Sequence, residues 1–176
     1  SGRSRKPQMN LAEELGIRDY LCPAGGCLLT DREFSAKFFD LLKHKPGFTL
    51  ADARLLKIGR HFRLPGGAKS VVGRNQEENV FLEKTVREND VLLVSTEVPG
   101  PTVVCRDCEV RDDVRLSAAL AAYYTREDRR QNLQLAVNDF RNEKKESILR
   151  NIAPLPRDTV EACRICSQRL EKVRTA

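Results

Sequence analysis

The first part of the chain carries apolar residues at helical spacing. Those at positions 34, 38, 41 and 42 recur with the 3.6-residue period of a helix. The preceding run Thr30-Asp31-Arg32-Glu33 has the spacing of a capping box, and Lys45-Pro46-Gly47 breaks the pattern. The start signal recurs at Thr49-Leu50-Ala51-Asp52, for a short helix that reaches about Lys57. We therefore expect two helices here, after a shorter one over residues 11–17.

From Gly59 onward the pattern alternates between strand-like and helical segments. Strands are predicted at residues 61–64, 69–72, 90–95, 102–105 and 133–137, with turns at 65–67 and 98–101. Helices are predicted from the cap residue Asn75, over the Ala- and Leu-rich residues 116–124, and from about Asp158 to Arg174. The order β-β-α-β-β-α-β, followed by α, predicts an α+β fold. We expect a small mixed sheet with packed helices, a helical N-terminal prefix and a C-terminal helix.

Changes in pattern divide the chain into three parts. Residues 1–58 are predicted to be a linker and helical prefix, residues 59–140 an α+β domain, and residues 141–176 an extension that ends in the terminal helix. The chain starts Ser1-Gly2-Arg3, without an initiator Met. We therefore expect it to follow an upstream domain that is missing here.

Composition and charge add a preference for an anionic partner. Of the 176 residues, 40% are hydrophobic and 32% are charged, and 31 Lys and Arg against 25 acids give a net charge of +6 and a pI near 9.1. No apolar run approaches the ~20 residues that span a bilayer, and no apolar signal core follows the start. We expect a cytoplasmic protein without a membrane partner. The positive charge favours contact with phosphates, although soluble proteins often have a mild basic bias.

Several short segments occur in an order that resembles one known family. They are Val72-Gly73-Arg74-Asn75 with Glu78-Asn79, then Glu88-Asn89-Asp90, Val98-Pro99-Gly100-Pro101, and Ala118-Ala119-Leu120-Ala121-Ala122-Tyr123-Tyr124. Residues from about 62 to 139 resemble the NFACT-R family, an RNA-binding module of ribosome-quality-control proteins that also stands beside some tRNA thiolation enzymes. The resemblance implies that residues 59–140 are a non-catalytic RNA-binding domain. The family usually has an aromatic residue and a His after the Asp, whereas Asp90 is followed by Val91-Leu92-Leu93-Val94. We therefore expect backbone contact to carry most of the binding.

A second resemblance concerns the start of the chain. Residues 2–8 and 23–31 look like the region just after the ATP-binding domain of tRNA 2-thiouridylases, which activate a uridine with ATP and then deliver sulfur. This resemblance implies the C-terminal region of an ATP-dependent tRNA sulfurtransferase, with tRNA or another structured RNA as one partner and an upstream catalytic domain as the other. No pyrophosphate-binding loop of the Ser-Gly-Gly type occurs in the chain. We therefore expect no catalysis and no cofactor in this part of the protein.

Positive side chains around the first predicted hairpin are the candidate RNA-binding surface. Alternate side chains of a strand point to opposite faces, so His61 and Arg63 would face solvent while Phe62 is buried. Arg74 and Asn75 lead into a helix whose first amides can face a phosphate. The predicted RNA-binding residues are Lys57, Arg60, His61, Arg63, Lys69, Arg74, Asn75 and Arg106. The alternatives are an ordinary solvated sheet face and simple helix capping by Asn75.

Six cysteines fall into three close pairs and offer a different function. Two CxxC pairs, Cys105 with Cys108 and Cys163 with Cys166, together make the ligand set of a structural zinc site. The alternatives are redox-reactive thiols and burial in the core. Burial is favoured for the second pair, because residues 160, 163, 166, 170 and 173 fall on one face of the predicted terminal helix.

The first cysteine pair lies near a predicted helix start. Cys27 is on a Gly-rich loop, and a helix N-terminus lowers the pKa of a thiol. In a sulfur-transfer protein Cys27 would carry a persulfide, with Cys22 as the resolving partner. The alternative is a small buried residue where the loop packs. The competing functions are therefore a sulfur-transfer or zinc-stabilised unit, and a protein-interaction appendage without chemistry.

Overall fold

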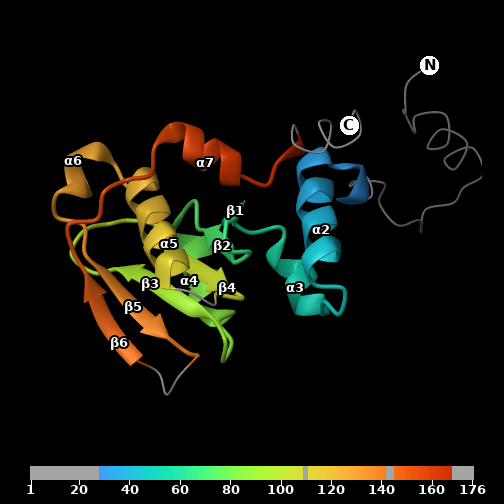
Figure 1. Cartoon of the computed structure of the whole chain (residues 1–176), viewed down its shortest axis with the longest axis horizontal. Coiled ribbons are helices and arrows are strands. Elements are labelled where there is room, and N and C mark those ends of the chain that lie inside the picture. The colour runs from blue at the N-terminus through green and yellow to red at the C-terminus, as the bar shows by residue number, and fades with distance from the viewer. Residues whose placement is uncertain (1–27, 109–110, 142–144, 168–176) are drawn as a thin grey trace, which may run out of the picture.

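The protein is described by a computed structural model that covers residues 28–108, 111–141 and 145–167 (Figure 1). In chain order, its elements are η1 (Leu28–Thr30), α2 (Arg32–His44), α3 (Leu50–Leu55), β1 (Arg60–Arg63), β2 (Lys69–Val72), α4 (Gln76–Lys84), β3 (Val91–Ser95), β4 (Val103–Arg106), α5 (Arg111–Tyr124), α6 (Glu127–Arg130), β5 (Leu135–Asp139), β6 (Lys145–Leu149) and α7 (Arg157–Cys163). This order confirms the α+β class, with helices before the sheet and a helix after it. The helix predicted at residues 11–17 lies outside the described ranges.

Six strands form one sheet in the order β1-β2-β4-β3-β5-β6. All five pairings between neighbouring strands are antiparallel. The first hairpin places Arg63 opposite Lys69, whereas Arg60 lies opposite Val72. The strand β6 and the helix α6 have no counterpart among the predicted elements. The sequence of β6, Lys-Glu-Ser-Ile-Leu, lacks the apolar alternation that would have indicated a strand.

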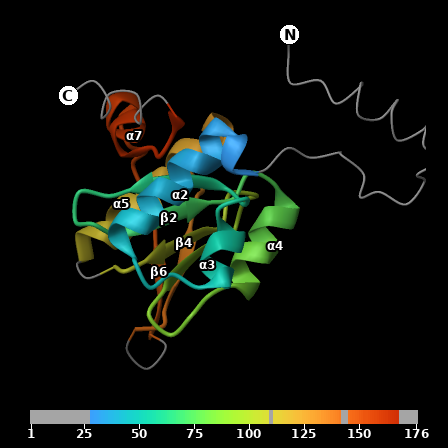
Figure 2. The ribbon, with the colours of Figure 1, turned by 90° about the vertical axis from the view of Figure 1, so that its right-hand side faces the viewer.

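Helices cover both faces of the sheet. α5 lies on one face (Figure 1) and packs into a core that includes Phe62, Val72, Leu93, Val103, Ala118, Ala121 and Ala122. Side chains of the opposite face pack with α3 and α4 in a second cluster, formed by Leu55, Val71, Leu82, Leu92 and Val104. Figure 2 shows α2, α3 and α4 in front of the sheet on this second face. Within the described ranges, no helix is long and apolar enough to cross a bilayer.

Side-chain caps fix the starts of the helices on the second face. Asp31 caps α2 by accepting a 2.7 Å hydrogen bond from the amide of Phe34, so the predicted cap position at Thr30 was wrong by one residue. Thr49 and Asp52 form the predicted capping box of α3. Asn75 caps α4, as expected, by accepting a 2.9 Å hydrogen bond from the amide of Glu78. These caps satisfy amides that have no partner inside the helix.

The C-terminal helix is shorter than the sequence predicted. α7 ends at Cys163 because Arg164 adopts an extended conformation and forms a β-bridge with Phe62 at the edge of β1. The amide of Ile165 then donates a 2.9 Å hydrogen bond to the carbonyl of His61. The predicted continuous helix across residues 163–165 is therefore wrong, and residues 168–174 lie outside the described ranges. This contact ties the end of the domain to its first strand.

Candidate nucleic-acid interface

The motif around Gly73 connects β2 and α4 to the turn before β4. Gly73 donates a 2.9 Å backbone hydrogen bond to the carbonyl of Thr102. The amide side chain of Asn79 spans the same corner: it donates to the carbonyl of Gly100 at 3.2 Å and accepts from the amide of Thr102 at 3.0 Å. A side chain at Gly73 would collide with Asn79. These motif residues therefore have a structural function, because they hold the 99–101 turn against the start of α4.

Arg74 leaves this corner toward solvent. Its side chain is 47% exposed and forms an ion pair with Glu78, one turn along the helix, with an Nε–Oε1 distance of 2.9 Å. Burial alone would raise the pKa of Glu78, but the hydrogen bonds and charge of Arg74 outweigh it and hold that pKa below its usual value. Arg74 also donates a 3.4 Å hydrogen bond to the carbonyl of Lys57. The guanidinium is thus oriented but remains accessible.

Lys57 and Asn75 are the other predicted RNA-binding residues that lie fully on the surface. Because Arg74 reaches the backbone of Lys57 and Asn75 follows Arg74 at the start of α4, the three residues form one patch, which we call the α4 corner. Arg60 is half-buried instead, with its guanidinium 4.5 Å from the centre of the Tyr124 ring. Its charge is directed toward an aromatic face in a cation–π contact.

Other members of the predicted set are directed inward. His61 is 1% exposed, Lys69 is 6% exposed and Arg106 is 5% exposed. The expectation that His61 and Arg63 would face solvent was wrong, because the second face of β1 is covered by α2. A ring nitrogen of His61 lies 2.8 Å from the carbonyl of Ile58, and burial together with nearby lysines lowers the pKa of its imidazole strongly. His61 is therefore a neutral interior residue.

The carboxylate of Asp40 on α2 neutralises two of these cations. Its oxygens lie 2.6 Å from Nη2 of Arg63 and 3.3 Å from Nζ of Lys69. The Arg63 side chain is only 14% exposed. Burial lowers the pKa of Lys69 to about 8, against the opposing effect of Asp40. A cation that is desolvated and paired in this way offers little to an external phosphate.

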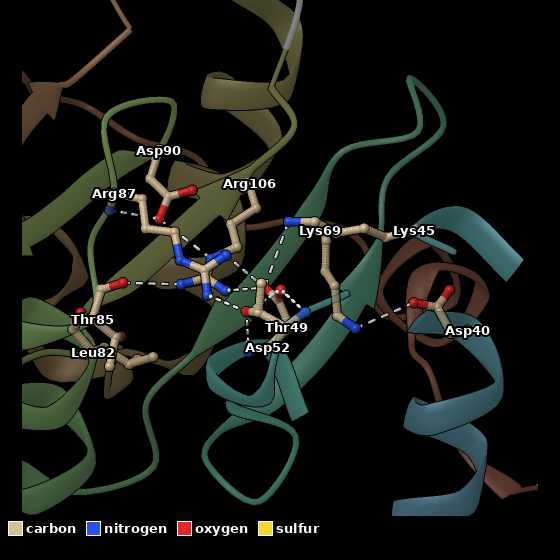
Figure 3. A network of polar contacts seen from close by, with 10 residues as sticks. All are labelled: Asp40, Lys45, Thr49, Asp52, Lys69, Leu82, Thr85, Arg87, Asp90 and Arg106. Carbon is tan, nitrogen blue, oxygen red and sulfur yellow. Dashed lines mark hydrogen bonds and ion pairs between the residues drawn. The ribbon is translucent and has the colours of Figure 1, made fainter. Parts of the chain in front are cut away.

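Arg106 is the centre of a second network, shown in Figure 3. Its guanidinium contacts Asp52 at 3.0 Å and Asp90 at 3.2 Å, and donates to the carbonyl of Thr85 at 2.9 Å. Burial raises the pKa of Asp90, and Arg106 opposes that rise. Burial also favours a higher pKa for Asp52, but the Thr49 hydrogen bonds and nearby cations outweigh it and lower that pKa to about 2. This arrangement holds α3 and the start of β3 against β4.

We call these groups the buried charge cluster. It consists of Arg63, Lys69 and Arg106 with Asp40, Asp52 and Asp90. Three of the eight predicted RNA-binding residues belong to it. Asp90, which the family resemblance also singled out, accepts from one of them, Arg106. Whether any predicted residue contacts RNA stays a prediction. The structure shows only which of them are accessible.

The cysteines of the two CxxC pairs do not meet. Cys105 and Cys108 are buried at the end of β4, Cys163 is buried at the end of α7, and Cys166 is half-buried beyond that helix. Across the described ranges, no three His, Cys, Asp or Glu side chains gather as a metal site requires. The four-cysteine zinc ligand set is therefore not formed. Burial of Cys163 agrees with the core alternative, whereas Cys166 lies past the helix. Cys22 and Cys27 lie outside the described residues.

The described residues form a small α+β domain in which Lys57 and Arg74 of the predicted set remain exposed. Residues 59–164 match the family model of the NFACT protein RNA binding domain, and the chain belongs to this family. Among solved structures, the C-terminal part of the fibronectin/fibrinogen-binding protein from Streptococcus suis is similar, with a TM-score of 0.49 and 18% sequence identity over 91% of this chain and 73% of that one. A search of curated proteins gives no match.

Proposed function

We propose that this RNA-binding domain contacts the phosphate backbone of a structured RNA through the α4 corner, Lys57, Arg74 and Asn75. Membership of the family supplies RNA as the partner class. The observation that supports the location is the contrast in burial: Lys57 and Arg74 are exposed, whereas Lys69 and Arg106 are buried and paired. Positive side chains that solvent reaches supply the electrostatic part of RNA affinity.

A further cation reinforces the potential at this corner. Lys37 on α2 donates hydrogen bonds to the carbonyls of Leu56 and Gly59, at 3.2 Å and 3.4 Å. Burial and then the charge of Arg74 lower the pKa of Lys37, so the two cations lie within electrostatic range of each other. Together with the first amides of α4, these groups favour an anion beside Asn75.

Backbone contact rather than base stacking fits the residues present. The residues after Asp90, where the family usually has an aromatic residue and a His, are Val91, Leu92 and Leu93, and all three are buried in β3. They cannot stack on a base without unfolding the strand. Phosphate contacts position an RNA without reading its sequence, so we expect recognition by shape and charge.

The test is RNA binding by fluorescence anisotropy over a salt series. The double variant Lys57→Ala/Arg74→Ala should bind labelled tRNA roughly tenfold or more weakly, and its log–log salt slope should be less negative by about one to two. The matched control is Arg115→Ala/Arg126→Ala, which removes two cations whose side chains are 79% and 71% exposed elsewhere on the domain. Equal effects of the two double variants would place the RNA elsewhere. Failure of the unsubstituted chain to bind any RNA would reject the function itself.

The finer proposal is that the RNA is tRNA and that the chain serves a tRNA-thiolating enzyme in the cytoplasm. Its support is the sequence resemblance at residues 2–8 and 23–31, of which only residues 28–31 lie inside the described ranges. Competition separates the finer proposal from the coarser one. Unlabelled tRNA should displace the probe at lower concentration than a single-stranded RNA of equal length, and equal displacement would leave only general RNA binding.

A further inference from the structure

The sulfur atoms of Cys105 and Cys108 lie together in the core behind β4. Cys105 is 0% exposed and Cys108 is 4% exposed, and the Cys108 thiol donates a hydrogen bond to the Cys105 sulfur. Between them, Asp107 has a φ of 53°, in the left-handed region that Asp tolerates better than most residues. This turn brings two cysteines three positions apart into side-chain contact.

Two hydroxyl groups complete the surroundings of Cys105. Ser70 of β2 lies opposite Cys105 in the register of the two strands, and its hydroxyl oxygen lies 2.5 Å from that of Ser117 on α5. One serine therefore donates to the other, and the second is left to donate to the Cys105 sulfur. Both serines are fully buried. A hydroxyl donor and the Cys108 thiol therefore converge on one buried sulfur, and the buried carboxylate of Asp113 lies within electrostatic range of it. A plain packing role would need no such polar groups.

The two thiols of the pair differ in character. The hydrogen bond from Cys108 is the main reason that the pKa of Cys105 is lowered, because it outweighs the opposing effect of burial, and the two serines add to it. The same hydrogen bond, followed by burial, raises the pKa of Cys108. Cys105 is therefore the better nucleophile and Cys108 the thiol that keeps its proton.

We propose that Cys105 and Cys108 are a dithiol site that hydrogen peroxide oxidises to an intramolecular disulfide. The Cys105 thiolate attacks one peroxide oxygen, the O–O bond breaks, and the departing hydroxide takes up the proton that Cys105 released, which gives a sulfenic acid and one water. Cys108 then loses its proton and attacks the sulfenic sulfur, and the hydroxide displaced there leaves as a second water. Sulfur is oxidised and peroxide is reduced, and a dithiol reductant reverses the bond by exchange.

Peroxide is the oxidant that suits this burial. A molecule of nearly the size of water can reach a sulfur that a bulky disulfide cannot. Cys108, with its small exposed fraction, marks the side from which it enters. Arg106 lies between the two cysteines and anchors the buried charge cluster, so the backbone turn that joins the sulfurs also supports that network. The proposal does not depend on RNA binding.

Trypsin makes the cross-link easy to detect. Arg106 is the cleavage site between the two cysteines, so digestion yields residues 88–106 and 107–111 as separate peptides when the thiols are reduced. In the folded, peroxide-treated chain, alkylated under denaturing conditions, we expect these two peptides to be joined and to separate on addition of dithiothreitol. The control Cys163→Ser, which removes another buried thiol, should still form the joined peptide.

Two further variants test the order of the steps. In Cys108→Ser, peroxide should leave a sulfenic acid on Cys105 that dimedone, added with the denaturant, traps there. In Cys105→Ser, or in Cys105→Ala if the serine variant does not fold, Cys108 should remain unlabelled. The positive control is the chain unfolded in guanidinium, in which the same peroxide treatment should join the two peptides. The proposal is overturned if that treatment joins them in the unfolded chain but not in the folded chain. Labelling of Cys108 in place of Cys105 would also overturn it.

Discussion

The α4 corner and the buried charge cluster use the same residue types in opposite ways. At the corner, Lys57 and Arg74 point to solvent and the carboxylate of Glu78 orients Arg74 without burying it. In the cluster, Lys69 and Arg106 lie in the interior and each contacts an aspartate. The two regions are joined by β2, whose first residue is Lys69 and whose last residue precedes the Gly73 motif. Positive charge in the sequence therefore does not by itself locate an anion-binding surface.

The helical prefix decides which cations are available. Asp40 and Asp52 lie on α2 and α3, before residue 59, where the match to the RNA-binding family begins. Their carboxylates neutralise Arg63, Lys69 and Arg106, which lie inside the matched segment. The prefix is thus part of the electrostatic structure of the domain. Without those carboxylates, Arg63 and Lys69 would lose their ion-pair partner, and Arg106 would keep only Asp90.

The largest expected effect comes from removing the central cation of the cluster. Arg106→Ala leaves Asp52 and Asp90 buried without their shared partner, and breaking such a buried pair costs about 3–5 kcal/mol. Chemical denaturation should show this loss in the free energy of unfolding. RNA affinity of the fraction that remains folded should be unchanged, because Arg106 is 5% exposed and does not reach solvent.

Arg87→Ala is the control for that measurement. Arg87 contacts the same carboxylate, with Nη1 2.8 Å from Asp52, but its side chain is 34% exposed. Solvent screens such a pair, so its loss should cost no more than about 1 kcal/mol. If Arg87→Ala proves as destabilising as Arg106→Ala, burial is not what distinguishes the cluster from the surface.

The next effect depends on pH and concerns Lys69. Its pKa is lowered to about 8 in the folded protein, so the unfolded chain holds more protons on this residue between about pH 8 and its ordinary pKa of 10.5. Stability of the native protein should therefore rise with pH across that window relative to Lys69→Met, which lacks the titrating group. Denaturation of both proteins at several pH values measures the difference. A constant difference across the window would show that folding does not lower the pKa of Lys69.

Local chemistry made several elements predictable from the sequence. Thr49 and Asn75 act as caps because their side-chain oxygens accept hydrogen bonds from backbone amides only three residues ahead. The strand at Lys69–Val72 follows from its two β-branched valines and the turn before it. Similarly, the family resemblance depended on short segments whose order is visible in the chain.

The predictions that were wrong concern residues whose contact partners lie far away in the sequence. The guanidinium of Arg106 is paired in the interior with Asp52, which lies 54 residues earlier in the chain. The ammonium of Lys69 is paired with Asp40, which lies 29 residues earlier. The terminal helix ends early because Ile165 bonds to His61. Alternation along one strand could place His61 on a face, but it could not show that another helix covers that face.

The smallest expected effect separates the two functions that meet at Asn75 in the α4 corner. Asn75→Ala removes the cap of α4 and should lower stability by about 1 kcal/mol. Asn75→Asp keeps a capping oxygen and places a negative charge at the helix start, so stability should be nearly unchanged. If RNA phosphates lie at this corner, however, Asn75→Asp should bind RNA more weakly than Asn75→Ala, although it is the more stable variant. Thermal denaturation measures the stability of each variant, and fluorescence anisotropy on the same samples measures its RNA affinity. Equal RNA binding by the two variants would mean that Asn75 serves only to cap the helix, and that the phosphate backbone lies closer to Lys57.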